Sequence, residues 1–141
     1  MKVLVDTSVW SLALRRKSEA LSAAERLIVA ELTELIGEGR AAIIGLIRQE
    51  LLSGVKTAEQ YEKLRAHLQA FDDEPVGRAD YEDAAKLSNA CRTKGIAVFA
   101  VDLLICAVAI KRGWAIFATD ADFATYARVL PVKHHRPRKA L

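Results

Sequence analysis

The segment VDLLICAVAIKRGWAIFATD, residues 101–120, decides the fold because it joins a buried helix to a buried strand. Residues 103–110 carry no charged side chain, and Lys111-Arg112-Gly113 is a typical helix end. Trp114 to Ala118 is apolar at every position, as in a parallel strand with both faces covered. The segment therefore predicts a helix buried on several sides, followed by a strand of a parallel sheet.

The rest of the chain repeats this alternation of short apolar strands and longer helices. Strands are predicted at 2–5, 41–44, 114–118 and 129–132, and helices at 8–15, 22–37, 45–54, 57–71, 79–94, 102–112 and 120–126. Ser22 with Glu25 and Thr57 with Gln60 are predicted capping boxes. Parallel strands joined by helices imply an α/β sandwich with a central parallel sheet. The length of 141 residues suits one domain, residues 1–141, with a basic tail at approximately 133–141.

Composition argues against several classes of protein. Hydrophobic residues make up 52% and charged residues 28%, as in an ordinary globular domain. The apolar runs are far shorter than the roughly 20 residues that span a bilayer, and the N-terminus starts directly with a strand pattern rather than a secretory signal. Cys91 and Cys106 fall on apolar helix faces and resemble core thiols. We therefore expect a cytoplasmic protein without membrane contact.

The net charge of +3 is unevenly distributed. The chain has no acidic residue after Asp122, and a basic tail follows, with a second basic cluster at Arg15-Arg16-Lys17. Such clusters can neutralise the phosphates of a nucleic acid. A solvated, partly disordered tail is the alternative, and the residues of the tail leave both open.

Four carboxylates lie in apolar surroundings, at Asp6, Glu50, Asp102 and Asp120. Two of these aspartates, at 6 and 120, follow predicted strands, the third begins the buried helix, and Glu50 lies in the first turns of the helix after strand 41–44. Because sites form at the carboxyl ends of parallel strands, the four can converge on one edge of the sheet. The alternatives are helix caps for the aspartates and Asp122, and a solvent-facing position for Glu50.

Oxygen ligands without histidine or cysteine suit a hard cation, Mg²⁺ or Mn²⁺. Such an ion activates water and stabilises a phosphate under in-line attack, so phosphodiester hydrolysis is the chemistry that the carboxylates favour.

Four motifs resemble those of PIN-domain nucleases, in the same order. They are Asp6-Thr7-Ser8-Val9-Trp10, Arg48 to Gly54, Val101 to Ala107, and Ala118 to Phe123. Order, spacing and length resemble the VapC toxins of toxin–antitoxin modules. The resemblance implies a three-layer α/β/α sandwich and a Mg²⁺- or Mn²⁺-dependent endoribonuclease. It also implies a homodimer, an RNA substrate, and a VapB-type antitoxin whose C-terminal segment covers the active site in a hetero-oligomer.

The resemblance also suggests roles for single residues. Asp6, Asp102 and Asp120 would be metal ligands, and Glu50 would complete the acidic catalytic set. Thr7 and Thr119 would support the ligands. Asp122 would either help to bind a second ion or cap the following helix, and we favour the cap. Ala100-Val101 departs from the small polar or proline residue that many relatives carry there.

Other functions fit the sequence less well. A dehalogenase-type phosphatase needs a second aspartate two positions after the first, where this chain has Ser8, and the acidic pair of a receiver domain is missing. A catalytically silent PIN-fold module that binds RNA or protein remains the alternative. The apolar stripes of helices 22–37 and 57–71 could bind an antitoxin or a second subunit, although core packing accounts for most of them.

Overall fold

The computed structural model of the chain describes residues 1–139. Its elements follow in the order β1 (Val3–Val5), α1 (Thr7–Leu14), a 3-10 turn η1 (Ser18–Ala20), α2 (Ala23–Gly37), β2 (Ala41–Ala42), α3 (Gly45–Leu52), α4 (Ala58–Leu68), α5 (Arg78–Thr93), α6 (Ala100–Arg112), β3 (Ala115–Phe117) and α7 (Asp122–Tyr126).

A small parallel sheet lies at the centre, with β1 between β2 and β3. Val3 pairs with Ala41 on one side and with Ala115 on the other, so the three strands run in register. Every residue of β1 is at most 2% exposed, because both faces of the sheet are covered. The prediction of an α/β sandwich around a parallel sheet is confirmed.

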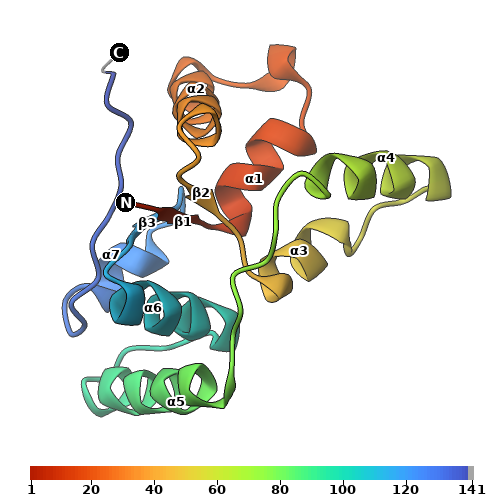
Figure 1. Cartoon of the computed structure of the whole chain (residues 1–141). Helices are drawn as coiled ribbons and strands as arrows, with labels where there is room; N and C mark the ends of the chain where they lie inside the picture. Colours follow the sequence, from red (N-terminus) through yellow and green to blue (C-terminus); the bar gives the residue numbers. More distant parts are fainter. Residues whose placement is uncertain (140–141) are drawn as a thin grey trace.

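The helices lie on both sides of this sheet (Figure 1). Helices α1 and α2 pack together on one side, and α5 and α6 form a packed pair on the other. Residues 103–109 of α6 are all buried, and α6 contacts β1 and β3, as the apolar segment predicted. It begins two residues earlier than expected, because Ala100 and Val101 continue the helix and the Phe99 carbonyl accepts from Leu103 N at 3.1 Å.

Two helix starts were predicted as capping boxes. Ser22 and Glu25 form one at α2, with both reciprocal hydrogen bonds present. Thr57 accepts from the backbone N–H of Gln60 as an N-cap of α4. A further carboxylate that the sequence did not suggest, Asp80, accepts from Gly77 N at the start of α5.

The predicted strand at 129–132 is wrong. Val129 N and Leu130 N both donate to the Tyr126 carbonyl and close the end of α7, and Pro131 has no N–H to give to a sheet. The chain joins the sheet two residues later, through a bridge between Ile116 and His134. On α5, two apolar or aromatic side chains face the solvent. Tyr81 is 54% exposed and Ala85 is exposed, because α5 packs chiefly against α6.

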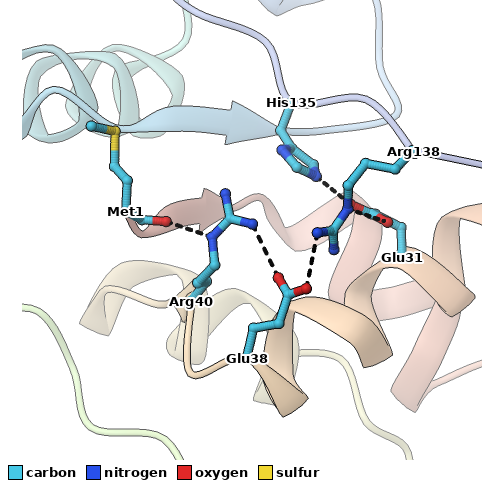
Figure 2. Close-up of polar contacts among 6 residues, drawn as sticks. All are labelled: Met1, Glu31, Glu38, Arg40, His135 and Arg138. Carbon is cyan, nitrogen blue, oxygen red and sulfur yellow. Dashed lines mark hydrogen bonds and ion pairs between the residues drawn. The ribbon is translucent and has the colours of Figure 1, made fainter.

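The basic segment after residue 132 is tied to α2 (Figure 2). Glu31 of α2 is only 5% exposed and binds both His135 Nε2 and, at 2.9 Å, Arg138 Nε. Arg138 also donates to Glu38 at 2.9 Å. The alternative of a solvated, partly disordered tail therefore does not hold at His135 and Arg138, whereas Lys133 and Arg136 are exposed. The part of the predicted tail at residues 140–141 lies outside the described residues. No helix in the described part of the chain is long and apolar enough to cross a bilayer.

Candidate active site

Ser8 joins the loops that follow β1 and β3. Asp6 comes directly after β1, and its backbone N–H donates to the Phe117 carbonyl at 2.8 Å. The Asp6 carboxylate accepts from Ser8 Oγ at 2.6 Å and from Ser8 N at 3.1 Å. Ser8 Oγ in turn accepts from Thr119 N at 3.0 Å. The loop that carries Asp120 is thereby held against Asp6 at the carboxyl edge of the sheet.

Asp6 is both a helix cap and a buried acid. It occupies the N-cap of α1, so the capping alternative holds for this residue. Only 5% of Asp6 is exposed. Burial raises the pKa of the Asp6 carboxyl, the hydrogen bonds from Ser8 lower it, and the charge of Glu50 raises it again. A cap alone does not explain why a second carboxylate lies near enough to repel it.

Asp102 lies in the first turn of α6 and is not its cap, which is Phe99. Its Oδ2 atom accepts a 2.8 Å hydrogen bond from the Tyr126 hydroxyl. Burial, and to a smaller extent the charges of Asp6, Asp120 and Asp122, raise the pKa of Asp102 to about 6 although this hydrogen bond lowers it. Tyr126 was missed by sequence reasoning. The available signal was a tyrosine on the helix just after the fourth motif, since a buried hydroxyl needs a partner.

Glu50 is exposed, as the solvent-facing alternative has it, and it also contacts the site from α3. Thr7 Oγ1 donates to Glu50 Oε1 at 2.6 Å, which links α3 to the first turn of α1. Arg48, two residues earlier, fixes this helix from its other side. Its guanidinium donates to Asp73 and to the Leu68 carbonyl, each at 2.9 Å, and also to the Phe71 carbonyl.

Asp120, and not Asp122, accepts the backbone hydrogen bond at the start of α7. Helix α7 begins at Asp122 with Ala121 as its N-cap and no side-chain cap bond, so the expected cap role of Asp122 is wrong. Instead, Asp120 Oδ1 accepts from Asp122 N at 3.1 Å, as in a turn that precedes a helix. Burial and the charge of Asp6 raise the pKa of Asp120. Thr119 contributes its backbone N–H to Ser8.

The chemistry of this donor set suits a divalent cation. The carboxylates at 6, 50, 102 and 120 have hydroxyls and backbone N–H groups as hydrogen-bond partners. Neither these four nor Asp122 forms an ion pair with a lysine or arginine among residues 1–139. Their mutual repulsion is therefore left for a cation to relieve. Within the same residues, no three acidic, histidine or cysteine side chains are already gathered at metal-binding distance. The side chains must draw together to hold an ion.

A basic groove lies one helix length from the acidic cluster. It encloses about 470 Å³ between the end of α1, the loop after α3, and α4. Its apolar lining includes Ala13, Leu14, Val55 and Leu64, and its basic lining includes Arg15, Lys56, Lys63 and His67. Helix α1 begins at the acidic cluster and ends in the groove, and the loop that lines the groove at Gly54 and Val55 follows α3, which carries Glu50.

A parallel α/β sandwich that collects acidic side chains at the carboxyl edge of its sheet defines the class of PIN domains. A family model described as the PIN domain matches residues 3–129. The chain therefore belongs to the PIN-domain family, and the resemblance found in the sequence is confirmed.

Curated relatives place the chain more closely, with the VapC ribonucleases. It is 31% identical over 131 residues to a VapC ribonuclease of Mycobacterium bovis and to ribonuclease VapC11 of Mycobacterium tuberculosis, covering 90% of this chain and 92% of each relative. Solved structures share the fold at lower identity. FitAcB from Neisseria gonorrhoeae is 21% identical with a TM-score of 0.75, covering 96% of this chain and 97% of that one. VapBC2 from Rickettsia felis, bound to a promoter DNA fragment, is 17% identical with a TM-score of 0.73, covering 96% and 98%.

Proposed function

We propose that the chain is the toxin of a type II toxin–antitoxin pair and a Mg²⁺- or Mn²⁺-dependent endoribonuclease. The observation that carries the proposal is the uncompensated acidic cluster, in which the charges of Asp6 and Asp120 add to the burial that raises the pKa of Asp102 to about 6. The ribonuclease names of the curated relatives support the same activity. Asp6, Asp102 and Asp120 would hold the ion, and Glu50 would complete the catalytic set.

The side chains around the cluster supply orientation and proton transfer. A divalent ion bound there would activate water and neutralise charge on the scissile phosphate. Ser8 fixes the Asp6 carboxylate and Tyr126 fixes that of Asp102, so both point into the site before substrate arrives. Thr7 holds one oxygen of Glu50, and the other oxygen would accept the proton of the attacking water.

Cleavage of RNA by the purified chain tests the activity. We expect Mg²⁺-dependent cleavage of structured RNAs that EDTA abolishes and that Asp6→Asn or Asp102→Asn reduces by at least about a hundredfold. Asp72→Asn is the matched control, because this aspartate is exposed and lies outside the cluster. Cleavage that survives EDTA or Asp102→Asn would contradict the mechanism. Calorimetry without Mn²⁺ binding, and no RNA cleavage, would favour a silent binding module.

The antitoxin proposal rests on the basic groove. Solved neighbours of this fold are described as VapBC and toxin–antitoxin complexes, and a basic rim over an apolar floor suits an amphipathic segment with acidic side chains. We propose that a VapB-type antitoxin occupies this groove and extends over the acidic cluster, within a hetero-oligomer of toxin dimers.

Charge reversal in the groove tests this partner. Lys56→Glu with Lys63→Glu should weaken binding of the cognate antitoxin at least about tenfold and leave cleavage of a short RNA intact. Lys86→Glu, on the exposed face of α5, is the control. Unchanged antitoxin affinity would remove the groove from the interface. Sedimentation that shows only monomer at micromolar concentration would contradict the dimer.

A further inference from the structure

An exposed apolar lip, defined as residues 97–101, lies beside the acidic cluster. Its sequence is Ala-Val-Phe-Ala-Val, without a polar side chain. The valines at 98 and 101 pack against the core, whereas Phe99 between them is 60% exposed. The two valines are partly buried, whereas the ring of Phe99 lies in solvent and is available to something other than the core.

Phe99 lies at the same end of α6 as the acid Asp102. It is the N-cap of α6, and Asp102 is the third residue of that helix. The side chain of the third residue of a helix can reach back toward the backbone of the N-cap, so Asp102 lies close to the Phe99 backbone. The hydroxyl of Tyr126 links them. Burial and Asp102 raise the pKa of the Tyr126 hydroxyl, and the nearby backbone of Phe99 lowers it.

A substrate strand needs attraction at this rim that does not depend on charge. Without a bound ion the carboxylates repel the phosphates of RNA, and the cationic groove lies at the far end of α1. An aromatic face stacks on any base and is the usual way in which proteins hold unpaired RNA.

We propose that Phe99 stacks on an RNA base beside the scissile phosphate and sets the position of the strand over Asp102. This role rests on the ribonuclease function proposed above. It predicts that a single-stranded or looped substrate is held at one nucleotide by the lip, with little preference among bases that stack equally well.

Steady-state kinetics on a short RNA, cut at a site mapped with the wild type, tests the role. Phe99→Ala should raise KM by roughly 5- to 100-fold, in line with the loss of one stacked base, and Phe99→Trp should restore it. Phe99→Leu keeps an apolar side chain without an aromatic face and should behave like Phe99→Ala. Tyr81→Ala is the matched control, because Tyr81 is 54% exposed near the start of α5, which packs beside α6 in the opposite direction.

Abasic substrates separate stacking from a structural effect. Removing the base at one position beside the cut should raise the KM of the wild type by the same factor as the Phe99→Ala substitution does. The same abasic substrate should hardly change the KM of Phe99→Ala. Equal losses in both proteins at every position would overturn the proposal. So would Phe99→Leu with wild-type KM, or a change from dimer to monomer in Phe99→Ala, which would assign the ring to the subunit interface.

A binding assay without cleavage distinguishes this role from the activity itself. RNA with 2-aminopurine beside the cut is titrated in EDTA with the Asp120→Asn chain, and we expect fluorescence quenching that Phe99→Ala abolishes. Cleavage without Phe99-dependent quenching would overturn the stacking role and leave the ribonuclease standing. Phe99-dependent quenching without cleavage by the wild type would overturn the ribonuclease and leave the stacking role standing. If neither quenching nor cleavage is seen, the stacking role and the ribonuclease function are both overturned.

Discussion

The Tyr126 hydroxyl donates a 2.8 Å hydrogen bond to Asp102, although the two residues lie 24 positions apart in the chain. The bond connects the first turn of α6 with the last residue of α7, and it crosses the carboxyl edge of the sheet. It lowers the pKa of an acid that burial and three neighbouring aspartates raise. Tyr126 therefore stabilises the charged form that a metal ligand requires.

We expect Tyr126→Phe to weaken the metal site more than the fold. Without the hydroxyl, the pKa of Asp102 should rise further, so a smaller fraction of the Asp102 side chains is charged near neutral pH. The Asp102 carboxylate also loses the hydrogen bond that orients it. Mn²⁺ affinity measured by calorimetry should fall roughly 10- to 100-fold, as for other residues that orient metal ligands. Tyr61→Phe, with its ring 41% exposed on α4, is the control. Equal Mn²⁺ affinity of wild type and Tyr126→Phe would show that the hydrogen bond does not tune the site.

Asp102→Asn should stabilise the protein when no metal is bound. The raised pKa of Asp102 means that its ionised form is disfavoured in the fold, so its charge lowers the free energy of unfolding at neutral pH. Neutralising it should add on the order of 1–2 kcal/mol in EDTA, after allowance for partial exposure. Mn²⁺ should raise the melting temperature of the wild type and have a smaller effect on the variant. If Asp102→Asn were less stable than the wild type in EDTA, the charge of Asp102 would not be what lowers the free energy of unfolding.

The positions of the acids could be predicted from the sequence, but their partners could not. Asp6 and Asp120 follow apolar strands, and the rule that parallel strands end at one edge placed them correctly. The bridge from Ser8 to Thr119 spans 111 residues and depends on β1 and β3 being neighbours, which no local pattern specifies. Asp122 was misassigned because aspartate at a helix start resembles a cap, while the turn formed by Asp120 already supplied an acceptor.

Errors in the fold have local physical causes. The apolar pattern at 129–132 resembles a strand, but Pro131 and the backbone bonds to Tyr126 turn the chain first. The basic tail was interpreted from charge alone. Its partner, Glu31, lies on α2 in a helical pattern that suggests an exposed face, and only the packing of 133–138 onto that helix reveals it as buried.

Glu31→Gln should destabilise the protein and release the C-terminal segment. Burial raises the pKa of Glu31, and the hydrogen bonds from His135 and Arg138 outweigh this and lower it. The amide keeps the size of the side chain but removes the charge that both partners bind, so we expect a loss of about 1–3 kcal/mol in urea unfolding. Faster hydrogen exchange at His135 N, which donates to Ile116 at 2.8 Å, should accompany it. Glu34→Gln, on the exposed side of α2, is the control. Unchanged exchange at His135 would show that the sheet pairing holds the segment without Glu31.

Arg112 should hold the α5–α6 pair together in a way that depends on pH. Its guanidinium donates to Glu74 at 2.9 Å and to Asp80 at 3.1 Å, and Asp80 is only 5% exposed. The hydrogen bond from Arg112 lowers the pKa of Asp80 below its ordinary value, so the stabilisation is fully present above about pH 4 and is lost as the pH falls through the folded-state pKa.

Two variants separate the charge on Asp80 from its packing. Arg112→Met leaves Asp80 buried without its partner and should cost about 2–4 kcal/mol at pH 7, whereas adding Asp80→Asn should restore part of that loss. The difference in unfolding free energy between wild type and Asp80→Asn should shrink as the pH is lowered toward 3, because the wild-type carboxyl then takes up a proton. The exposed pair of Glu62 and Arg65 serves as the comparison, and Glu62→Gln should change stability little. If Arg112→Met were as mild as Glu62→Gln at pH 7, the buried pair would contribute no more than a surface one.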